Sequence, residues 1–224
     1  MYNIPKGQIM KKLINWFKQY GYYYKYVFIT LAFSVALIIL GVVSCLSKES
    51  YDLRVILSGD FYIYDTEIAA YEEIFEEYIE DWNGDGKVNV QVLGLSTSAG
   101  SAELNYSYSQ RFQAEVMSGE ISLFITDDTK FTTLDNSNGV AEVSQYLPDG
   151  YPQTKYFELS SSPFAKKVTE RYIKLFGNEK LPTQIQDGLR MYMRVPLDSK
   201  TSTEEYRKDY DRVAELFKKI ANEK

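Results

Sequence analysis

The stretch DLRVILSGD, from Asp52 to Asp60, sets the fold class of this chain. Its first seven residues form a short apolar run rich in β-branched side chains, which predicts a strand over 52–58. Ser58, Gly59 and Asp60 then interrupt the run, because residues of these types favour turns. We therefore expect a strand that ends in a turn, with the rest of a domain built outward from it.

Helical and extended patterns alternate after this strand. Apolar side chains recur at helical spacing in two segments, the first with Asp65 as its N-cap. Valines alternate with polar residues in a third segment, and ISLFIT forms a fourth. The predicted elements are helices over 66–81 and 102–117 and strands over 88–93 and 121–126. Strands that alternate with helices through short links predict a parallel sheet with right-handed crossovers.

The patterns after residue 127 are weaker. Asp, Asn, Ser, Gly and Pro are frequent over 127–163, and we assign no element there. A helix near 164–176 and a strand over 188–196 follow, and a capping box of Ser202 and Glu205 predicts the start of a last helix. The fold class we expect is α/β, a three-layer domain with a mostly parallel sheet.

One apolar segment precedes this domain. No charged residue occurs from Tyr26 to Leu46, and a helix of that length crosses a hydrocarbon core of about 30 Å. We therefore predict a transmembrane helix over 26–46, a basic and aromatic tail over 1–25 and an outer domain over 51–224. The alternative is a buried core helix, although core helices are seldom this long without a polar face.

Charge predicts the orientation of the anchor. Five lysines and no acidic residue precede residue 48, and such flanks stay in the cytoplasm. All 31 acidic residues and 20 of the 25 basic residues follow, which gives the outer part a net charge of −11. A domain of that charge repels nucleic acid. We expect a single-pass protein of the cell membrane with a cytoplasmic N-terminus, an extracellular domain and no nucleic-acid partner.

The chain has one cysteine, Cys45, so no disulfide can form within it. The sequence VVSC over 42–45 is similar to a bacterial lipobox, whose cysteine is lipidated after cleavage. The basic segment before the apolar run is long for a cleaved signal. The alternative is a small residue near the end of a helix.

The loop DWNGDGKV, from Asp81, matches the start of an EF-hand calcium loop. The expected oxygen ligands are Asp81, Asn83, Asp85, the carbonyl of Lys87, and Asn89. Position 12 of the motif, normally a bidentate acid, is Val92, so Glu77 or Glu80 would have to supply the missing carboxylate. Calcium bound here would have a structural role, linking the helix over 66–81 to the strand over 88–93. The alternative is a tight turn that is rich in Asn, Asp and Gly and binds no metal.

A ligand site is predicted where the three parallel strands end. If the first strand lies in the middle, these ends meet at one edge, which is where open α/β sheets bind ligands. The residues that we expect there are Ser58, Asp60, Tyr62, Asp127 and Asp128. The acidic surroundings favour a neutral or cationic ligand. The alternative is a set of solvated loop residues.

Catalysis has little support in the sequence. The chain contains no histidine, which excludes Ser-His-Asp and Cys-His catalysis and histidine zinc sites. It has no P-loop or Rossmann motif. Paired carboxylates remain, and two of them could hydrolyse a glycosidic bond. We expect a protein that is not an enzyme, with a carboxylate-based hydrolase as an alternative.

Several segments together are similar to known proteins. The segments YYYKY, DLRVILSGDFY, EDWNGDGKVNVQV and RFQAEVMSGEISLFITDD resemble a group of uncharacterised membrane-anchored proteins of Gram-positive bacteria. The stretch QAEVMSGEISLFITDD also looks like the helix-Gly-strand element of extracellular solute-binding proteins of the type 2 periplasmic-binding fold. This second resemblance covers residues 52–128 and implies one lobe, whereas those proteins usually have two.

The sequence therefore favours a membrane-anchored extracellular binding domain of the solute-binding type. Its partner would be a small solute, a peptide or an envelope protein. The first alternative is an interaction module that holds no small ligand, and an exposed apolar patch at the strand ends would favour it. Two buried carboxylates across a groove, one with a raised pKa, would favour the hydrolase.

Overall fold

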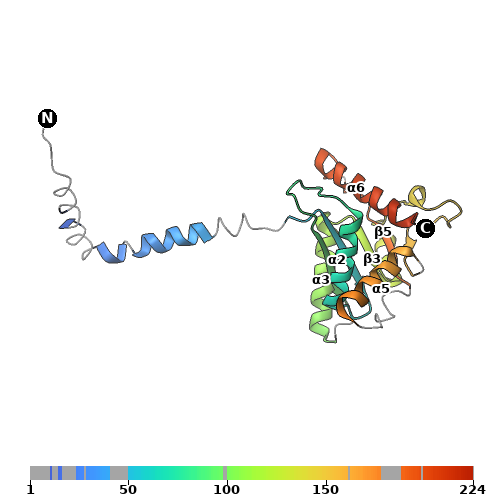
Figure 1. Ribbon diagram of the computed structural model, residues 1–224, viewed down its shortest axis with the longest axis horizontal. Helices are drawn as coiled ribbons and strands as arrows, with labels where there is room; N and C mark the ends of the chain where they lie inside the picture. Colours follow the sequence, from blue (N-terminus) through green and yellow to red (C-terminus); the bar gives the residue numbers. More distant parts are fainter. Residues whose placement is uncertain are drawn as a thin grey trace. The chain divides into compact units, whose positions relative to one another are not determined.

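The structure is a computed structural model that describes residues 11, 15–16, 24–27, 29–40, 50–97, 100–160, 162–177, 188–197 and 199–223 (Figure 1). The chain divides into two compact units, Met1–Glu49 and Ser50–Lys224. In the first unit, 24–27 and 29–40 are helical. Within the described residues, no helix has the length and apolar character needed to span a membrane. Cys45 and residues 41–46 of the predicted anchor lie outside the described residues.

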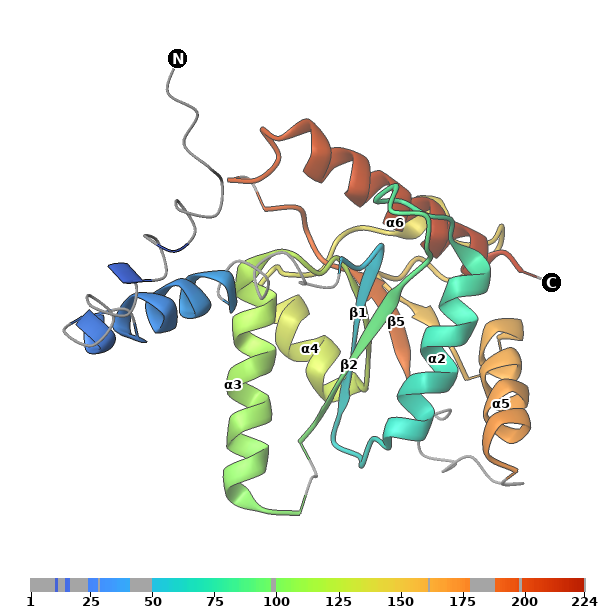
Figure 2. The ribbon, with the colours of Figure 1, turned by 60° about the vertical axis from the view of Figure 1, so that its left-hand side comes forward.

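The second unit contains one mixed sheet in the order β2-β1-β3-β5-β4 (Figure 2). Its strands are β1 (Leu53–Gly59), β2 (Val90–Ser96), β3 (Leu123–Thr126), β4 (Phe157–Glu158) and β5 (Arg190–Met193). Parallel pairing joins β1 to β2 on one side and to β3 on the other. The predicted α/β class and the central position of the first strand are confirmed. The later strand, β5, runs antiparallel to both β3 and β4, so only the three-stranded core of the sheet is parallel.

Helices cover both faces of the sheet. They are α2 (Asp65–Tyr78), α3 (Ala102–Ser118), α4 (Asp128–Asn136), α5 (Pro163–Phe176) and α6 (Glu204–Ala221), with a 3-10 turn η1 (Ser144–Tyr146). Side chains of β1 alternate between two cores: Val55 and Leu57 pack with α2, α5 and α6, whereas Ile56 packs with α3 and α4. This alternation follows from the pleat of a strand and produces three layers.

Two predicted helix starts differ from the structure. Helix α2 begins at Asp65, one residue earlier than predicted, and its N-cap is Tyr64. It ends at Tyr78 rather than at residue 81, because the chain is extended at Ile79. Helix α6 has Thr203 as its N-cap without a side-chain hydrogen bond. The capping box predicted from Glu205 is therefore wrong, and Glu205 lines a cavity instead.

The strand β2 forms one edge of the sheet, and α2 reaches this strand with a polar contact. The Glu72 carboxylate accepts a hydrogen bond of 2.9 Å from the backbone N–H of Val92. Burial raises the pKa of Glu72 above its ordinary value. Helix α2 thus covers one face of the sheet, and its Glu72 side chain also accepts a hydrogen bond from a backbone N–H of the edge strand β2.

Candidate functional site

The carboxyl ends of β1 and β3 lie side by side, as parallel pairing requires. The backbone N–H of Asp60 donates a hydrogen bond of 2.7 Å to the Asp127 Oδ2 atom. The N–H of Asp127 donates in turn to the carbonyl oxygen of Ser58, at 3.3 Å. The predicted proximity of Asp60 and Asp127 is confirmed, and this end of the sheet is called the carboxyl edge.

Two of the predicted ligand groups have structural partners at the carboxyl edge. Asp127 is the N-cap of α4, and its Oδ1 atom accepts a hydrogen bond of 2.8 Å from the N–H of Lys130. The hydroxyl of Ser58 is buried and donates to the carbonyl of Leu95 at 2.7 Å. These side chains join the loops to each other and to the first turn of a helix, which is a common use of Ser and Asp.

Asp128 forms an ion pair with Arg190 of β5. The Arg190 guanidinium also lies over the ring of Tyr156, 4.2 Å from its centroid, and over Phe131, at 5.1 Å. The aromatic faces and the carboxylate hold the arginine between β5 and α4. The charge of Asp128 is therefore partly compensated within the protein.

Aromatic side chains at the carboxyl edge are accessible. Tyr62 is 51% exposed, and its ring lies 4.5 Å from that of Tyr64, centroid to centroid. Leu104 and Tyr106 in the first turns of α3 are also exposed. The first turns of α2 and α3 follow the carboxyl ends of β1 and β2, so both helices begin at this end of the sheet (Figure 2).

The sequence analysis missed one residue near this edge, Glu67 in the first turn of α2. Its side chain is fully buried; one carboxylate oxygen accepts from the N–H of Tyr64 at 3.2 Å, and the other has no hydrogen-bond partner in the described part of the chain. Burial raises the pKa of Glu67 to about 7. A signal was present, because Glu67 shares the helical stripe of Tyr71 and Ile74.

The predicted calcium loop folds around its first carboxylate. Asp81 accepts hydrogen bonds from the N–H groups of Gly84 at 2.6 Å, Asp85 at 3.2 Å and Gly86 at 2.7 Å. Asn83 accepts from Asp85 at 2.9 Å. Both glycines have positive φ angles, 79° and 85°, which non-glycine residues rarely adopt. Among the described residues, no three His, Cys, Asp or Glu side chains are grouped to hold a metal.

One of the two acids predicted to complete this loop is engaged elsewhere. Glu77 forms an ion pair with Arg171, because α2 packs against α5. Glu80 follows the end of α2 at Tyr78 and stays a candidate. Asp52 also closes the loop: its carboxylate accepts from the N–H groups of Trp82, at 2.8 Å, and Asn83, at 2.9 Å, and from that of Asn89, at 2.8 Å. The sequence analysis had treated Asp52 only as the start of a strand.

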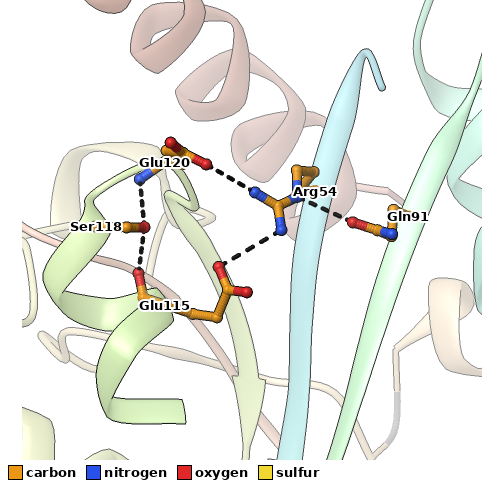
Figure 3. A network of polar contacts seen from close by, with 5 residues as sticks. All are labelled: Arg54, Gln91, Glu115, Ser118 and Glu120. Carbon is orange, nitrogen blue, oxygen red and sulfur yellow. Dashed lines mark hydrogen bonds and ion pairs between the residues drawn. The ribbon is translucent and has the colours of Figure 1, made fainter. Parts of the chain in front are cut away.

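The opposite end of the sheet, where its parallel strands begin, carries a cavity of about 570 Å³. It lies where β1 and β3 begin, and α6 forms one of its walls, so we call this end the amino edge. Arg54 on its wall contacts Glu120 at 3.0 Å, Glu115 at 3.5 Å and Gln91 at 3.0 Å (Figure 3). These contacts join β1, β2 and the end of α3.

Comparisons with known proteins do not add a functional assignment. No family model, curated protein or solved structure matches the chain. Any proposal about function therefore rests on the residues of this chain and their contacts.

Proposed function

We propose that this chain is a membrane-anchored binding protein whose domain over 51–224 lies outside the cell and holds its ligand without converting it. The uncharged segment 26–46 and the five lysines before it support this topology. The three-stranded parallel core supports a domain of the type found in one lobe of solute-binding proteins. Protease added to spheroplasts should digest the domain and spare the tail.

One observation carries the choice of site, the 2.7 Å hydrogen bond between the Asp60 N–H and Asp127. It joins the loops after β1 and β3 at the carboxyl edge, where a ligand of an open α/β sheet lies. Ser58 and Asp127 position these loops. The exposed carboxylate of Asp60 and the exposed ring of Tyr62 then offer a polar and an apolar contact to a neutral or cationic ligand.

The test uses the full chain in a nonionic detergent. Its melting temperature is measured with a panel of monosaccharides, amino acids and short peptides. We expect at least one member to raise it, because a ligand that binds only the folded state stabilises that state. The shift should disappear in Tyr62→Ala and persist in Met117→Ala, an exposed residue at the other end of α3. No shift with any member would contradict small-ligand binding at this edge.

The interaction module is the second candidate, and the exposed side chains of Tyr62, Tyr64, Leu104 and Tyr106 favour it. Exposed apolar side chains that gather at one place mark protein contacts. A photo-crosslinking amino acid at position 106 should join the chain to an envelope protein in cells, whereas the same group at position 117 should not. Crosslinking at neither position would argue against this candidate.

The hydrolase alternative has less support. Glu67 has the raised pKa that a general acid needs. It is, however, the only fully buried carboxylate among the described residues, and a glycosidase needs two. Asp127 accepts two backbone N–H groups, which leaves fewer of its lone pairs for a substrate.

We further propose that the loop 81–89 binds calcium in a structural role. The three N–H groups around Asp81 hold its carboxylate at the centre of the loop, and the Asp52 carboxylate accepts hydrogen bonds from the N–H groups of Trp82 and Asn83. The donors Asp81, Asn83 and Asp85 are hard oxygen ligands of the kind that calcium prefers. Calcium would then fix the link between α2 and β2.

A further inference from the structure

The cavity at the amino edge has the size and lining of a small-molecule site. Its volume, about 570 Å³, falls within the range of roughly 300–1,000 Å³ typical of ligand pockets. Four aromatic side chains line it, Tyr51 from the start of the domain, Trp82 from the loop after α2, and Tyr206 and Tyr210 from α6. The cavity is therefore shaped by segments about 150 residues apart in the chain.

One polar group in the lining lacks a partner. Ser122, directly before β3, is only 8% exposed and lines the cavity. No hydrogen bond joins its hydroxyl to another group of the described residues. The only buried side-chain polar atom without a partner among these residues is Glu67 Oε1, so the Ser122 oxygen is accessible from the cavity that it lines. A ligand in the cavity can therefore form a hydrogen bond with it.

The charged residues of the lining differ in how far they are compensated. Glu120 pairs with Arg54 at 3.0 Å and Asp209 with Arg212 at 3.1 Å. Glu205 is exposed and forms no ion pair within the described residues. The lining holds four acidic side chains, those of Asp52, Glu120, Glu205 and Asp209, and two basic ones, those of Arg54 and Lys200.

This excess of acid makes the cavity attractive to cations and unfavourable to anions. Aromatic rings add to the attraction, because their faces interact favourably with an ammonium group. Tyr210 is already oriented for this role, since its hydroxyl donates to the carbonyl of Arg194 at 2.9 Å and fixes its ring.

We propose that this cavity binds a small aliphatic amine. Its ammonium group donates hydrogen bonds to the Glu205 carboxylate, its methylene groups pack against the rings of Tyr206 and Tyr210, and a second donor reaches the Ser122 hydroxyl. A diamine satisfies all three requirements. The site is separate from the carboxyl edge, shares none of its residues, and does not depend on the function proposed for that edge.

The test is calorimetric titration of the full chain, in a nonionic detergent at low ionic strength, with putrescine as the probe. The matched neutral probe is 1,4-butanediol, which has the same length and hydrogen-bonding ends without the charge. We expect saturable binding of putrescine that weakens as salt is added. We expect no measurable binding of 1,4-butanediol.

Two variants locate the bound amine. Glu205→Gln should raise the dissociation constant of putrescine about tenfold, because a charge-assisted hydrogen bond becomes a neutral one. Glu204→Gln makes the same change of charge in the same turn, at a residue that does not line the cavity, and should leave the constant unchanged. Ser122→Val should weaken binding severalfold, with a melting curve to verify that the variant is folded.

Several results would overturn the proposal. One is the absence of any heat of binding for putrescine, and another is equal binding of 1,4-butanediol, which would exclude recognition of charge. Equal losses in Glu204→Gln and Glu205→Gln would show that putrescine responds to the general field of the domain. Loss of binding in Tyr62→Ala would place the amine at the carboxyl edge.

Discussion

The two edges of the sheet differ in how their polar groups are used. At the carboxyl edge, Asp127 and Ser58 already bond to backbone groups of neighbouring loops. At the amino edge, the hydroxyl of Ser122 has no hydrogen-bond partner among the described residues, and it lines a cavity. Topology alone points to the carboxyl edge. The hydrogen-bond partners of each side chain must therefore be known before the usual ligand position of a fold is taken as a binding site.

The largest effect is expected from pH, through Glu67 behind the carboxyl edge. Its pKa is about 7 in the folded protein and about 4.5 in the unfolded chain, so the folded state binds the proton more tightly. The free energy of unfolding should therefore fall by about 3 kcal/mol as pH rises from 4.5 through 7, and change little above that. Urea unfolding at several pH values measures this loss.

Two variants separate Glu67 from the other acids. Glu67→Gln cannot ionise and should lose the pH dependence over this range. Glu76→Gln, at an exposed position of the same helix, should keep it. A pH dependence that survives in Glu67→Gln would mean that another group of the domain is responsible.

The second effect concerns calcium at the loop 81–89, which connects α2 to β2. Calcium at a hundredfold excess over its dissociation constant should stabilise the domain by about 2.7 kcal/mol relative to chelator, because it binds only the folded loop. Thermal melting with calcium and with EDTA measures the difference. Asp81→Ala should abolish the difference, and Glu76→Ala, at an exposed position of α2, should not. Identical curves with calcium and with EDTA for the parent chain would contradict calcium binding.

The third effect tests whether the carboxyl edge is mainly structural. Asp127→Ala removes the N-cap of α4 and the acceptor for the Asp60 N–H, and should lower the free energy of unfolding by about 2 kcal/mol. Asp127→Asn keeps a capping oxygen and should cost less. Asp128→Ala is the control, since its side chain is largely exposed. Equal stabilities for all three variants would show that Asp127 does not hold this edge together.

The parallel core of the fold could be predicted from the sequence, because its strands and helices alternate with clear periodicity. The antiparallel direction of β5 could not, since its four residues, Arg190 to Met193, carry no signal of direction. Helix α4 was missed because polar residues dominate 127–163, and with it the capping role of Asp127.

The two candidate sites differ in the same way. The proximity of Asp60 and Asp127 followed from strand order alone. The cavity at the amino edge brings together residues near 51 and residues near 206, and no local pattern connects segments so far apart. Whether the Ser122 hydroxyl has a hydrogen-bond partner, and whether Glu205 has an ion-pair partner, can also be known only from the folded structure. Both depend on which groups lie nearby in space.

The contact between Glu72 and the Val92 N–H has a consequence for association between copies of the chain. Strand β2 is seven residues long and lies at the open edge of the sheet, so its free backbone groups form a template for a strand of another molecule. The Glu72 carboxylate occupies one of these donors and places a charge beside the edge. Glu72 thus helps to keep the sheet from growing by one strand at a time into an aggregate.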